Sequence, residues 1–309
     1  MNLIKKVATL VLVLIIAGFI YQTVTTHIDK KRYLPSGQFI NVEGVNFHYQ
    51  LSGQGQYTVV FDSGMGDSQR VWRKVKALLP KKGIRVFSYD RAGLGYSDRS
   101  ANDRTSENMT VELKQLLDAV GVTDSIILVG HSLGGLNAQL FAKNYPQMVA
   151  GLVLVDSAHE GQSERLPPAN QLQSTVFKMG MRAAPIGIPR LYLSLNDKTE
   201  QALKSTTKHQ YTLLAESNSF SVSQESISFE PQALGDIPIY VISRNSSVEQ
   251  LKEQTSSKYR LEWAKLQNEL LALSRNSEQV FTGQKYHSIH LRQPELVAEK
   301  IKKLLAIYR

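Results

Sequence analysis

The chain has 309 residues, a formal net charge of +9 and no cysteine. This length can form one large domain or two small ones, and either can bury a sizeable apolar core. The lack of cysteine excludes a disulfide framework, thiolate metal ligands and a cysteine nucleophile. Of the basic excess, +4 lies in the first 32 residues, and no dense basic tract interleaved with aromatic residues occurs. The composition therefore argues against a nucleic-acid-binding protein.

The N-terminal segment is apolar and uncharged over a long stretch. Lys5 and Lys6 precede it, and no formally charged residue occurs from Val7 to Ile28. The stretch is long enough to span a bilayer. A secretory signal peptide opens in the same way, but no convincing small-x-small cleavage site follows the apolar run. An uncleaved membrane anchor is therefore the favoured interpretation, and a cleaved signal segment is the alternative.

The expected organisation has four parts. A short basic N-terminus (1–6) precedes the anchor or signal segment (7–26), and a linker (27–38) leads to a globular domain (39–309). Basic residues lie on both sides of the apolar segment, so the charge bias that sets membrane orientation is weak. We favour a single-pass protein of the cell membrane whose globular domain lies outside the cytoplasm.

The globular part alternates between strand and helix patterns. It opens with a predicted hairpin, 39–44 and 45–53, that turns at Gly44. Apolar β-rich runs predict the later strands, and apolar spacings of three and four predict helices between them. The strands are expected at 57–66, 84–90, 125–129, 151–156, 237–243 and 277–283, and the helices at 68–80, 108–121, 136–146, 258–274 and 294–308. This alternation is typical of an α/β fold whose parallel sheet carries helices on both faces.

The alternation stops between residues 157 and 235. This stretch is too long for a structureless connection in a compact domain, so we interpret it as an inserted lid. Its segment 176–195, VFKMGMRAAPIGIPRLYLSL, is apolar and carries methionines. The segment is equally suited to line a pocket for an acyl or alcohol group and to form ordinary helix-packing surface.

A G-x-S-x-G motif lies between the strand predicted at 125–129 and the next helix. It consists of Gly130, Ser132 and Gly134. The motif alone occurs often by chance, but its position after a strand and before a helix is the context that a catalytic serine requires. A turn that exposes the serine hydroxyl strains the backbone, and small flanking residues let neighbouring chains approach it.

Five motifs, in this order, resemble those of the α/β-hydrolase family: FDSGMG, YDRAGLGYSD, GHSLGG, LVLVDSAHE and YHSIHLRQPELV. The likeness runs from about residue 39 to residue 309. It implies an α/β-hydrolase fold, with a mostly parallel eight-stranded sheet and helices on both faces. It further implies a nucleophile after the fifth strand and a helical lid inserted after the sixth.

The resemblance assigns roles to the serine and to the histidines. Ser132 is the expected nucleophile, and His287, in the loop after the last strand, is the expected general base. His290 is expected to be a neighbour that packs or forms a hydrogen bond nearby. His131, beside the nucleophile, is expected to point elsewhere and to have a structural role.

An oxyanion hole needs two backbone donors. The resemblance implies the N–H groups of Met65 and Leu133, with Ser63 at the position where many relatives carry histidine. In the YDRAGLGYSD motif, Asp90 and Arg91 are expected to form structural ion pairs and not to take part in catalysis.

The acid that orients the histidine is the point where the sequence departs from the family. Most relatives place an aspartate after the seventh strand, where this chain has SRNSSVEQ. Asp156, at the end of the sixth strand, is the favoured candidate because a carboxylate at the carboxyl end of a strand faces the ligand crevice. Glu249 is the alternative acid, and a dyad supported by Asn245 or Ser247 is the third possibility.

The resemblance implies a serine hydrolase that cleaves carboxylic esters of small-molecule substrates with small or medium acyl groups through an acyl-enzyme, without a metal or organic cofactor. The same triad can hydrolyse lactones, carbon–carbon bonds, or amides and peptides. In an aminopeptidase, Glu160 and Glu164 could bind the substrate ammonium. A membrane-tethered binding protein without efficient turnover is the alternative from a different class.

Overall fold

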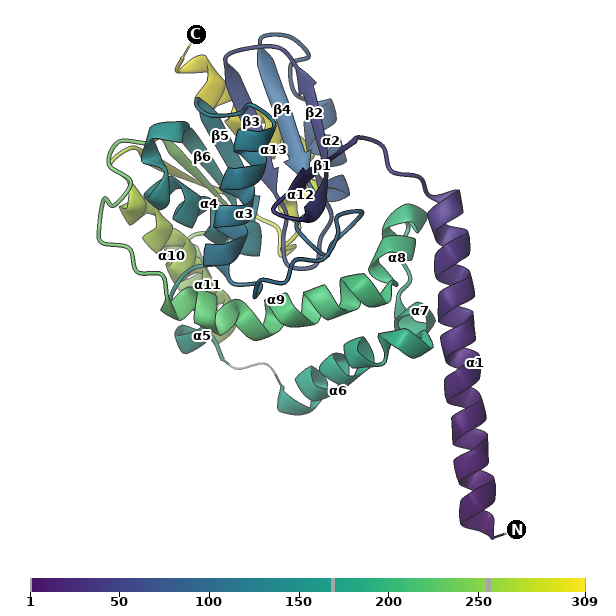
Figure 1. Ribbon diagram of the computed structural model, residues 1–309. Coiled ribbons are helices and arrows are strands. Elements are labelled where there is room, and N and C mark those ends of the chain that lie inside the picture. The colour runs from purple at the N-terminus through teal and green to yellow at the C-terminus, as the bar shows by residue number, and fades with distance from the viewer. Residues whose placement is uncertain (1, 168–169, 254–256, 309) are drawn as a thin grey trace.

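A computed structural model describes residues 2–167, 170–253 and 257–308. An eight-stranded sheet crosses the body of the molecule in the order β1-β2-β4-β3-β5-β6-β7-β8 (Figure 1). The first three strands in this order pair antiparallel, and the remaining pairs are parallel. The strands are β1 (Gln38–Val42), β2 (Val45–Gly53), β3 (Tyr57–Asp62), β4 (Ile84–Tyr89), β5 (Ile126–His131), β6 (Val149–Val155), β7 (Ile239–Ser243) and β8 (Ser277–Phe281). The predicted α/β fold with a mostly parallel eight-stranded sheet is confirmed.

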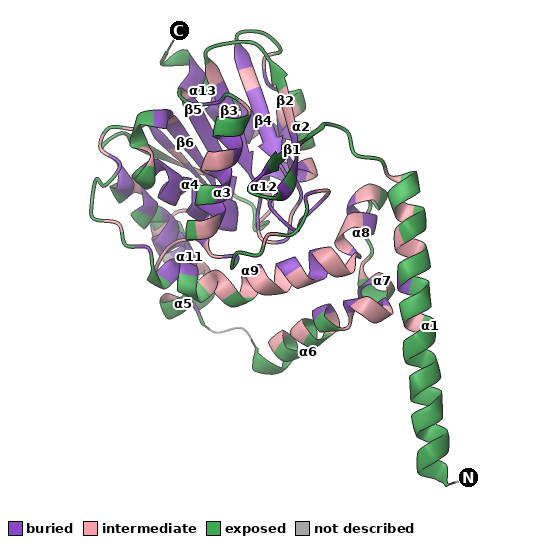
Figure 2. Cartoon of the chain, in the orientation of Figure 1, coloured by how far each residue is buried: buried purple, intermediate pink, exposed green. Residues whose placement is uncertain are grey.

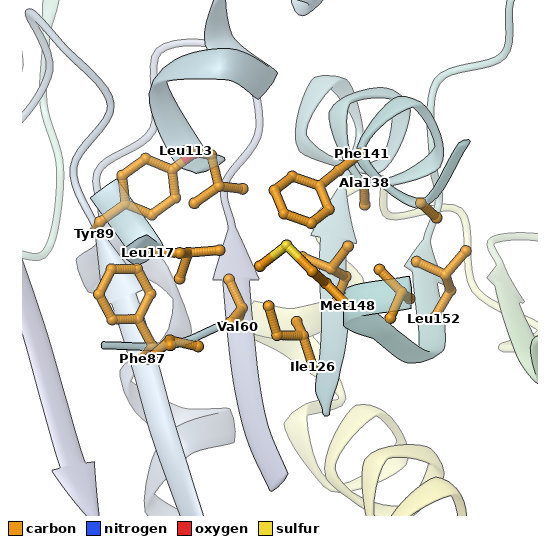
Figure 3. Packing of buried hydrophobic residues seen from close by; sticks show 14 of the residues in the cluster. Val60, Phe87, Tyr89, Leu113, Leu117, Ile126, Ala138, Phe141, Met148 and Leu152 are labelled. Atoms are coloured by element: carbon orange, nitrogen blue, oxygen red, sulfur yellow. The ribbon is translucent and has the colours of Figure 1, made fainter. Parts of the chain in front are cut away.

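Helices cover both faces of the sheet. The 3-10 turn η1 (Gln69–Trp72), α2 (Arg73–Ala77), α12 (Ile289–Arg292) and α13 (Pro294–Ala306) pack on one face. The other face carries α3 (Ser106–Ala119), α4 (Leu133–Asn144) and η4 (Leu270–Leu273), which follows α11 (Lys258–Glu269). Figure 3 shows how Leu113, Leu117 and Phe141 of the helices meet Val60 and Ile126 of the strands. The core thus lies on both sides of the sheet.

The central strands are apolar on both faces. Val59, Val60 and Phe61 of β3 have no exposed surface, and the same is true of the apolar run in β5. Parallel strands covered by helices on both sides require such continuous apolar runs, which explains why the sequence pattern located them well.

The beginning of α4 differs from the prediction. The helix was expected from residue 136 but begins at Leu133, directly after the serine turn. Gly134 and Gly135 resemble a loop in sequence, since glycine is a poor helix former. They are helical here, and glycine is required at both positions because a Cβ atom would lie within 2.4 Å of Asp62 or Ser157.

The stretch between β6 and β7 forms a set of helices outside the sheet. They are α5 (Gln162–Arg165), α6 (Gln171–Arg182), η3 (Ala184–Ile186), α7 (Ile188–Tyr192), α8 (Lys198–Lys204) and α9 (Thr207–Glu225). The long helix α9 runs along one margin of the body, and α6 lies outside it (Figure 1). A short helix, α10 (Val248–Glu253), follows β7.

The N-terminal helix α1 (Leu3–Arg32) projects away from the body (Figure 2). Its most apolar window has a mean hydropathy of 2.4 and none of that window is buried. The helix continues through residues 27–32, which were expected to belong to a linker. No proline or glycine occurs between residues 27 and 34, and the residue before Pro35 is disfavoured in a helix, so the helix ends shortly before it.

Candidate active site

Ser132 occupies a strained turn between β5 and α4. Its backbone has φ 51° and ψ −120°, in a region that L-residues rarely adopt. Such a conformation costs about 1–3 kcal/mol and persists only where the surroundings enforce it. The Ser132 carbonyl accepts hydrogen bonds from the N–H groups of Gly135 at 2.9 Å and Ala158 at 3.0 Å. The turn is therefore held from both the helix and the segment after β6.

The glycines around Ser132 are required by close backbone packing. A Cβ atom at Gly130 would lie 2.3 Å from the Gly134 carbonyl oxygen, and one at Gly134 would lie 2.4 Å from that of Asp62. Backbone atoms cannot yield as the end of a flexible side chain can. The motif thus brings β3 and α4 together directly beneath the serine.

His287 and Asp156 are in direct contact. The Nδ1 atom of His287 lies 2.5 Å from Oδ2 of Asp156, which is completely buried. A carboxylate only accepts hydrogen bonds, so Nδ1 carries the hydrogen and Nε2 is left as a proton acceptor. In the register of β5 and β6, His131 pairs with Val155. Ser132 and Asp156 therefore follow neighbouring strand ends.

Two further side chains contact Asp156, and sequence reasoning missed both. Trp263 on α11 donates its Nε1 hydrogen to Oδ1 at 2.9 Å, and Nε of Arg244 lies 3.3 Å from Oδ2. The Arg244 guanidinium also stacks over the Trp263 ring at 4.4 Å, a cation–π contact. One signal was available: Arg244 follows β7, where an aspartate was expected.

The other candidates for the acid lie elsewhere. Glu249 is exposed in the first turn of α10. The backbone of Asn245 exchanges hydrogen bonds with Gln284 and Gly283, and the Ser247 hydroxyl accepts from the N–H of Gln250. Asn245 thus joins the loops after β7 and β8, while Ser247 caps α10.

The loop after β3 faces the serine turn. Among the described residues, no protein group accepts a hydrogen bond from the N–H of Met65 or Leu133. The hydroxyl of Ser63 accepts from Trp72 Nε1 at 3.1 Å and donates to the Ser68 carbonyl at 3.1 Å. Ser63 therefore stabilises the loop by hydrogen bonds to Trp72 and Ser68, at the position where many relatives carry histidine.

Arg91 ties this loop to the lid. Its guanidinium contacts Asp62 at 2.7 Å, the Gly64 carbonyl at 2.7 Å and Glu216 of α9 at 2.9 Å. Glu216 in turn accepts from the N–H of Gly66 at 2.8 Å. Burial raises the pKa of Asp62, and the charge of Arg91 opposes that shift. The cluster fixes the loop with charge-assisted bonds between buried side chains.

Asp90 has a separate structural role. Its carboxylate contacts Nδ1 of His48 at 2.8 Å and accepts from the N–H of Gln69 at 2.8 Å. Arg91 thus forms ion pairs with Asp62 and Glu216, whereas Asp90 contacts the His48 ring and orders the start of η1.

Three histidines pack together behind the site. The rings of His131 and His287 are 4.6 Å apart, those of His131 and His290 are 4.4 Å apart, and Trp72 covers His290. His131 Nε2 lies 3.1 Å from the His287 carbonyl oxygen. Burial, and then the neighbouring histidines, hold the pKa of His131 well below its usual value. Burial also lowers the pKa of His290 to about 4. Both remain neutral at physiological pH.

The lid carboxylates considered for ammonium binding differ in environment. Glu160 accepts a hydrogen bond from the N–H of Phe229 at 2.9 Å, and burial raises its pKa. Glu164 is exposed on α5. Across the described ranges 2–167, 170–253 and 257–308, no group of three or more histidine and carboxylate side chains is arranged to hold a metal ion.

Comparisons with known proteins agree with this fold. A family described as the alpha/beta hydrolase fold matches residues 57–187. An uncharacterised protein of Bacillus subtilis, YqjL, is 28% identical over 257 residues, which cover 83% of this chain and 87% of that protein. The chain has the α/β-hydrolase fold, and its residues 57–187 match the sequence family described by that fold.

Solved structures share the fold at low identity. A proposed lipase from Acinetobacter baumannii AYE is 19% identical with a TM-score of 0.66, covering 93% of this chain and 95% of that one. An enol-lactonase from Burkholderia xenovorans LB400 is 19% identical with a TM-score of 0.63, covering 87% of this chain and all of that one. These likenesses establish the architecture and leave the substrate open.

The buried histidines should make the protein sensitive to acid. A histidine whose folded pKa is lowered binds its proton more readily when unfolded, so stability is present above pH 6.5 and is lost as pH falls toward 4. His290 alone accounts for about 3 kcal/mol of this loss. Neither ring nitrogen of His290 has a hydrogen-bond partner among the described residues. His290→Phe should therefore flatten the fall in melting temperature between pH 6.5 and 4.

The measurement is thermal unfolding of the full chain in detergent across that pH range. His27→Phe, at an exposed position of α1, is the matched control and should keep the wild-type pH dependence. An unchanged slope in His290→Phe would show that His290 does not titrate in this way.

Proposed function

We propose that the protein is a serine hydrolase that cleaves carboxylic esters through an acyl-enzyme. The observation that carries this proposal is the 2.5 Å contact between His287 and Asp156 beside the strained turn of Ser132. A serine, a histidine with one nitrogen held by a buried carboxylate, and two backbone donors form the set of groups that acyl transfer requires.

In this mechanism the hydroxyl of Ser132 attacks the ester carbonyl carbon, and its proton passes to Nε2 of His287. The N–H groups of Met65 and Leu133 stabilise the negative charge on the carbonyl oxygen. The tetrahedral intermediate collapses, and the alcohol leaves with the proton from His287. Water then attacks the acyl-enzyme by the same steps and releases the acid. Asp156 keeps Nδ1 protonated and stabilises the imidazolium.

Several related reactions share this chemistry. A lactone is a cyclic ester, so lactone opening needs no change in the mechanism. A serine nucleophile disfavours epoxide hydrolysis and dehalogenation, which in this family use a carboxylate to form an alkyl-enzyme ester. The aminopeptidase alternative needs Glu160 and Glu164 to bind a substrate ammonium, and it is weakened because Glu160 already accepts a hydrogen bond from the Phe229 backbone. We therefore place esters and lactones first.

We also propose that α1 is a retained anchor and that the hydrolase domain lies outside the cytoplasm. The support for the retained anchor is that α1 forms specific hydrogen bonds with the body. The Gln22 side chain accepts a hydrogen bond from Nε of Arg190 at 2.7 Å, and its amide donates to the Ser205 carbonyl at 2.9 Å. Gln22 is the buried residue of α1. A signal peptide that is removed would have no need of such contacts.

The nucleophile can be tested by covalent labelling. The protein should react with a fluorophosphonate at Ser132, because the neighbouring histidine activates that hydroxyl. Ser132→Ala and His287→Ala should lose labelling and the hydrolysis of p-nitrophenyl esters while keeping the circular dichroism spectrum. The labelled residue is located by peptide mass spectrometry. A folded wild-type protein that is neither labelled nor active would favour the binding-protein alternative.

The acid can be tested with two matched variants. Asp156→Asn should lower kcat/KM for a p-nitrophenyl ester by roughly 10³- to 10⁴-fold, because the amide cannot hold the same histidine tautomer. Glu249→Gln should change it by less than about twofold, as expected for a surface substitution. The reverse pattern would transfer the role of the acid to Glu249.

The anchor can be tested by intact mass. The protein should be recovered from the membrane fraction with residues 1–26 present, and alkaline carbonate should not release it. Recovery of a soluble form that lacks these residues would instead identify the segment as a cleaved signal peptide.

A further inference from the structure

The lid carries an exposed apolar stripe on α6. Leu172, Val176 and Met179 lie at positions i, i+4 and i+7, on one face of the helix, and their exposed fractions are 73%, 60% and 60%. Met181, on the opposite face, is completely buried, and α6 packs against α9. The stripe therefore faces away from the protein, where a soluble helix would carry polar residues.

The following helix extends this surface toward α1. Leu191 and Tyr192 at the end of α7 are 75% and 47% exposed. The connection between α6 and α7 packs closely on the N-terminal helix: a Cβ atom at Gly18 would lie 2.6 Å from the Ile186 carbonyl oxygen. We call Leu172, Val176, Met179, Leu191 and Tyr192 the lid face.

Polarity changes along the contact between α7 and α1 in a fixed order. Arg190 forms hydrogen bonds with Gln22, Thr26 and Asp29, toward the C-terminal end of α1. Nearer the N-terminus, Ile186 and Leu191 border a hollow of about 450 Å³ together with apolar residues of α1. The α1 residues of that hollow are Val11, Leu14, Ile15, Ala17, Gly18 and Tyr21. The lid residues that contact α1 are therefore apolar beside the apolar part of α1 and polar beside its polar part.

The length of α1 places this change at a membrane surface. Its apolar run, residues 7–21, is about 22 Å long at 1.5 Å per residue. The hydrocarbon core of a bilayer is about 30 Å thick. Because the apolar run is shorter than the hydrocarbon core of the bilayer, that hydrocarbon core extends at least to the level of Tyr21. Ile186 and Gly187 lie beside α1 at that level.

The lid face lies on the side of the body from which α1 projects. In Figure 1, α6 and α7 are at the lower margin of the body, and the N-terminal part of α1 continues beyond them. Most residues of α6 are exposed or intermediate (Figure 2). A bilayer that holds the N-terminal part of α1 would meet α6 and α7 before any strand of the sheet.

We propose that the lid face inserts into the surface of the bilayer that holds α1, so that the lid lies on the membrane and not in free solvent. The proposal rests on the anchoring proposed above. The partner is the boundary between headgroups and acyl chains, which accepts the apolar side of an amphipathic helix. Arg190 then lies at the headgroup level, where its charge is paired with Asp29 and remains near water.

The absence of cysteine allows a direct test in the full chain. Single-cysteine variants Val176→Cys, Ile15→Cys and Ile307→Cys can each be labelled with an environment-sensitive fluorophore and reconstituted in phosphatidylcholine vesicles. Ile15 lies in the apolar run of α1, and Ile307, 56% exposed, lies at the far C-terminal end of the body. Lipids brominated on the acyl chains quench a fluorophore only where it reaches the bilayer interior.

We expect strong quenching at position 15, at least half as much at position 176, and none at position 307. Quenching at 15 with none at 176 would overturn the lid proposal and leave the anchor intact. A lack of quenching at both 15 and 176 would overturn the anchor and, with it, the lid proposal. The substitution Val176→Cys replaces an exposed side chain, so it should not disturb folding.

Discussion

The buried carboxylate of Asp156 is the constraint on which the candidate site depends. It lies at the end of β6 and is reached by His287 from the loop after β8, by Trp263 from α11 and by Arg244 from the end of β7. A buried charge without partners is strongly unfavourable, and removing one partner of a buried pair commonly costs about 3–5 kcal/mol. Segments that are distant in sequence are therefore held at one point beside the serine turn.

A second set of buried charges holds the loop after β3. Arg91 joins the loop after β3 to Glu216 of the lid helix α9, and Glu216 also binds the N–H of Gly66. The loop that carries the proposed donor of Met65 thus has its conformation set partly by the lid. Donors for an oxyanion are effective only when they are held in place before the reaction. The lid therefore contributes to the candidate site by fixing the loop that carries one proposed donor.

The sequence predicted the sheet well because its central strands are continuous apolar runs, such as residues 126–129 in β5. It also predicted that Ser132 follows β5 and that His287 follows β8, since both belong to motifs with a fixed place between a strand and a helix. The contacts of Trp263 and Arg244 could not be predicted in this way. They depend on where α11 packs against β7, which involves residues far apart in the chain. The continuation of α1 to Arg32 is not predictable in this way, because the polar, basic composition of residues 27–32 is equally typical of a linker.

The hydrogen bonds between α1 and the lid are connected, through neighbouring residues of α8, to the loop after β3. Gln22 binds the carbonyl of Ser205 at the end of α8, and the preceding residue, Lys204, forms an ion pair with Asp67 at 2.6 Å. Asp67 is two residues from Met65. A shortened chain prepared without α1 would lose the bond at Ser205 and leave Arg190 without its three α1 partners. Its catalytic constants would then describe a loosened lid, so kinetics that represent this protein require the full chain.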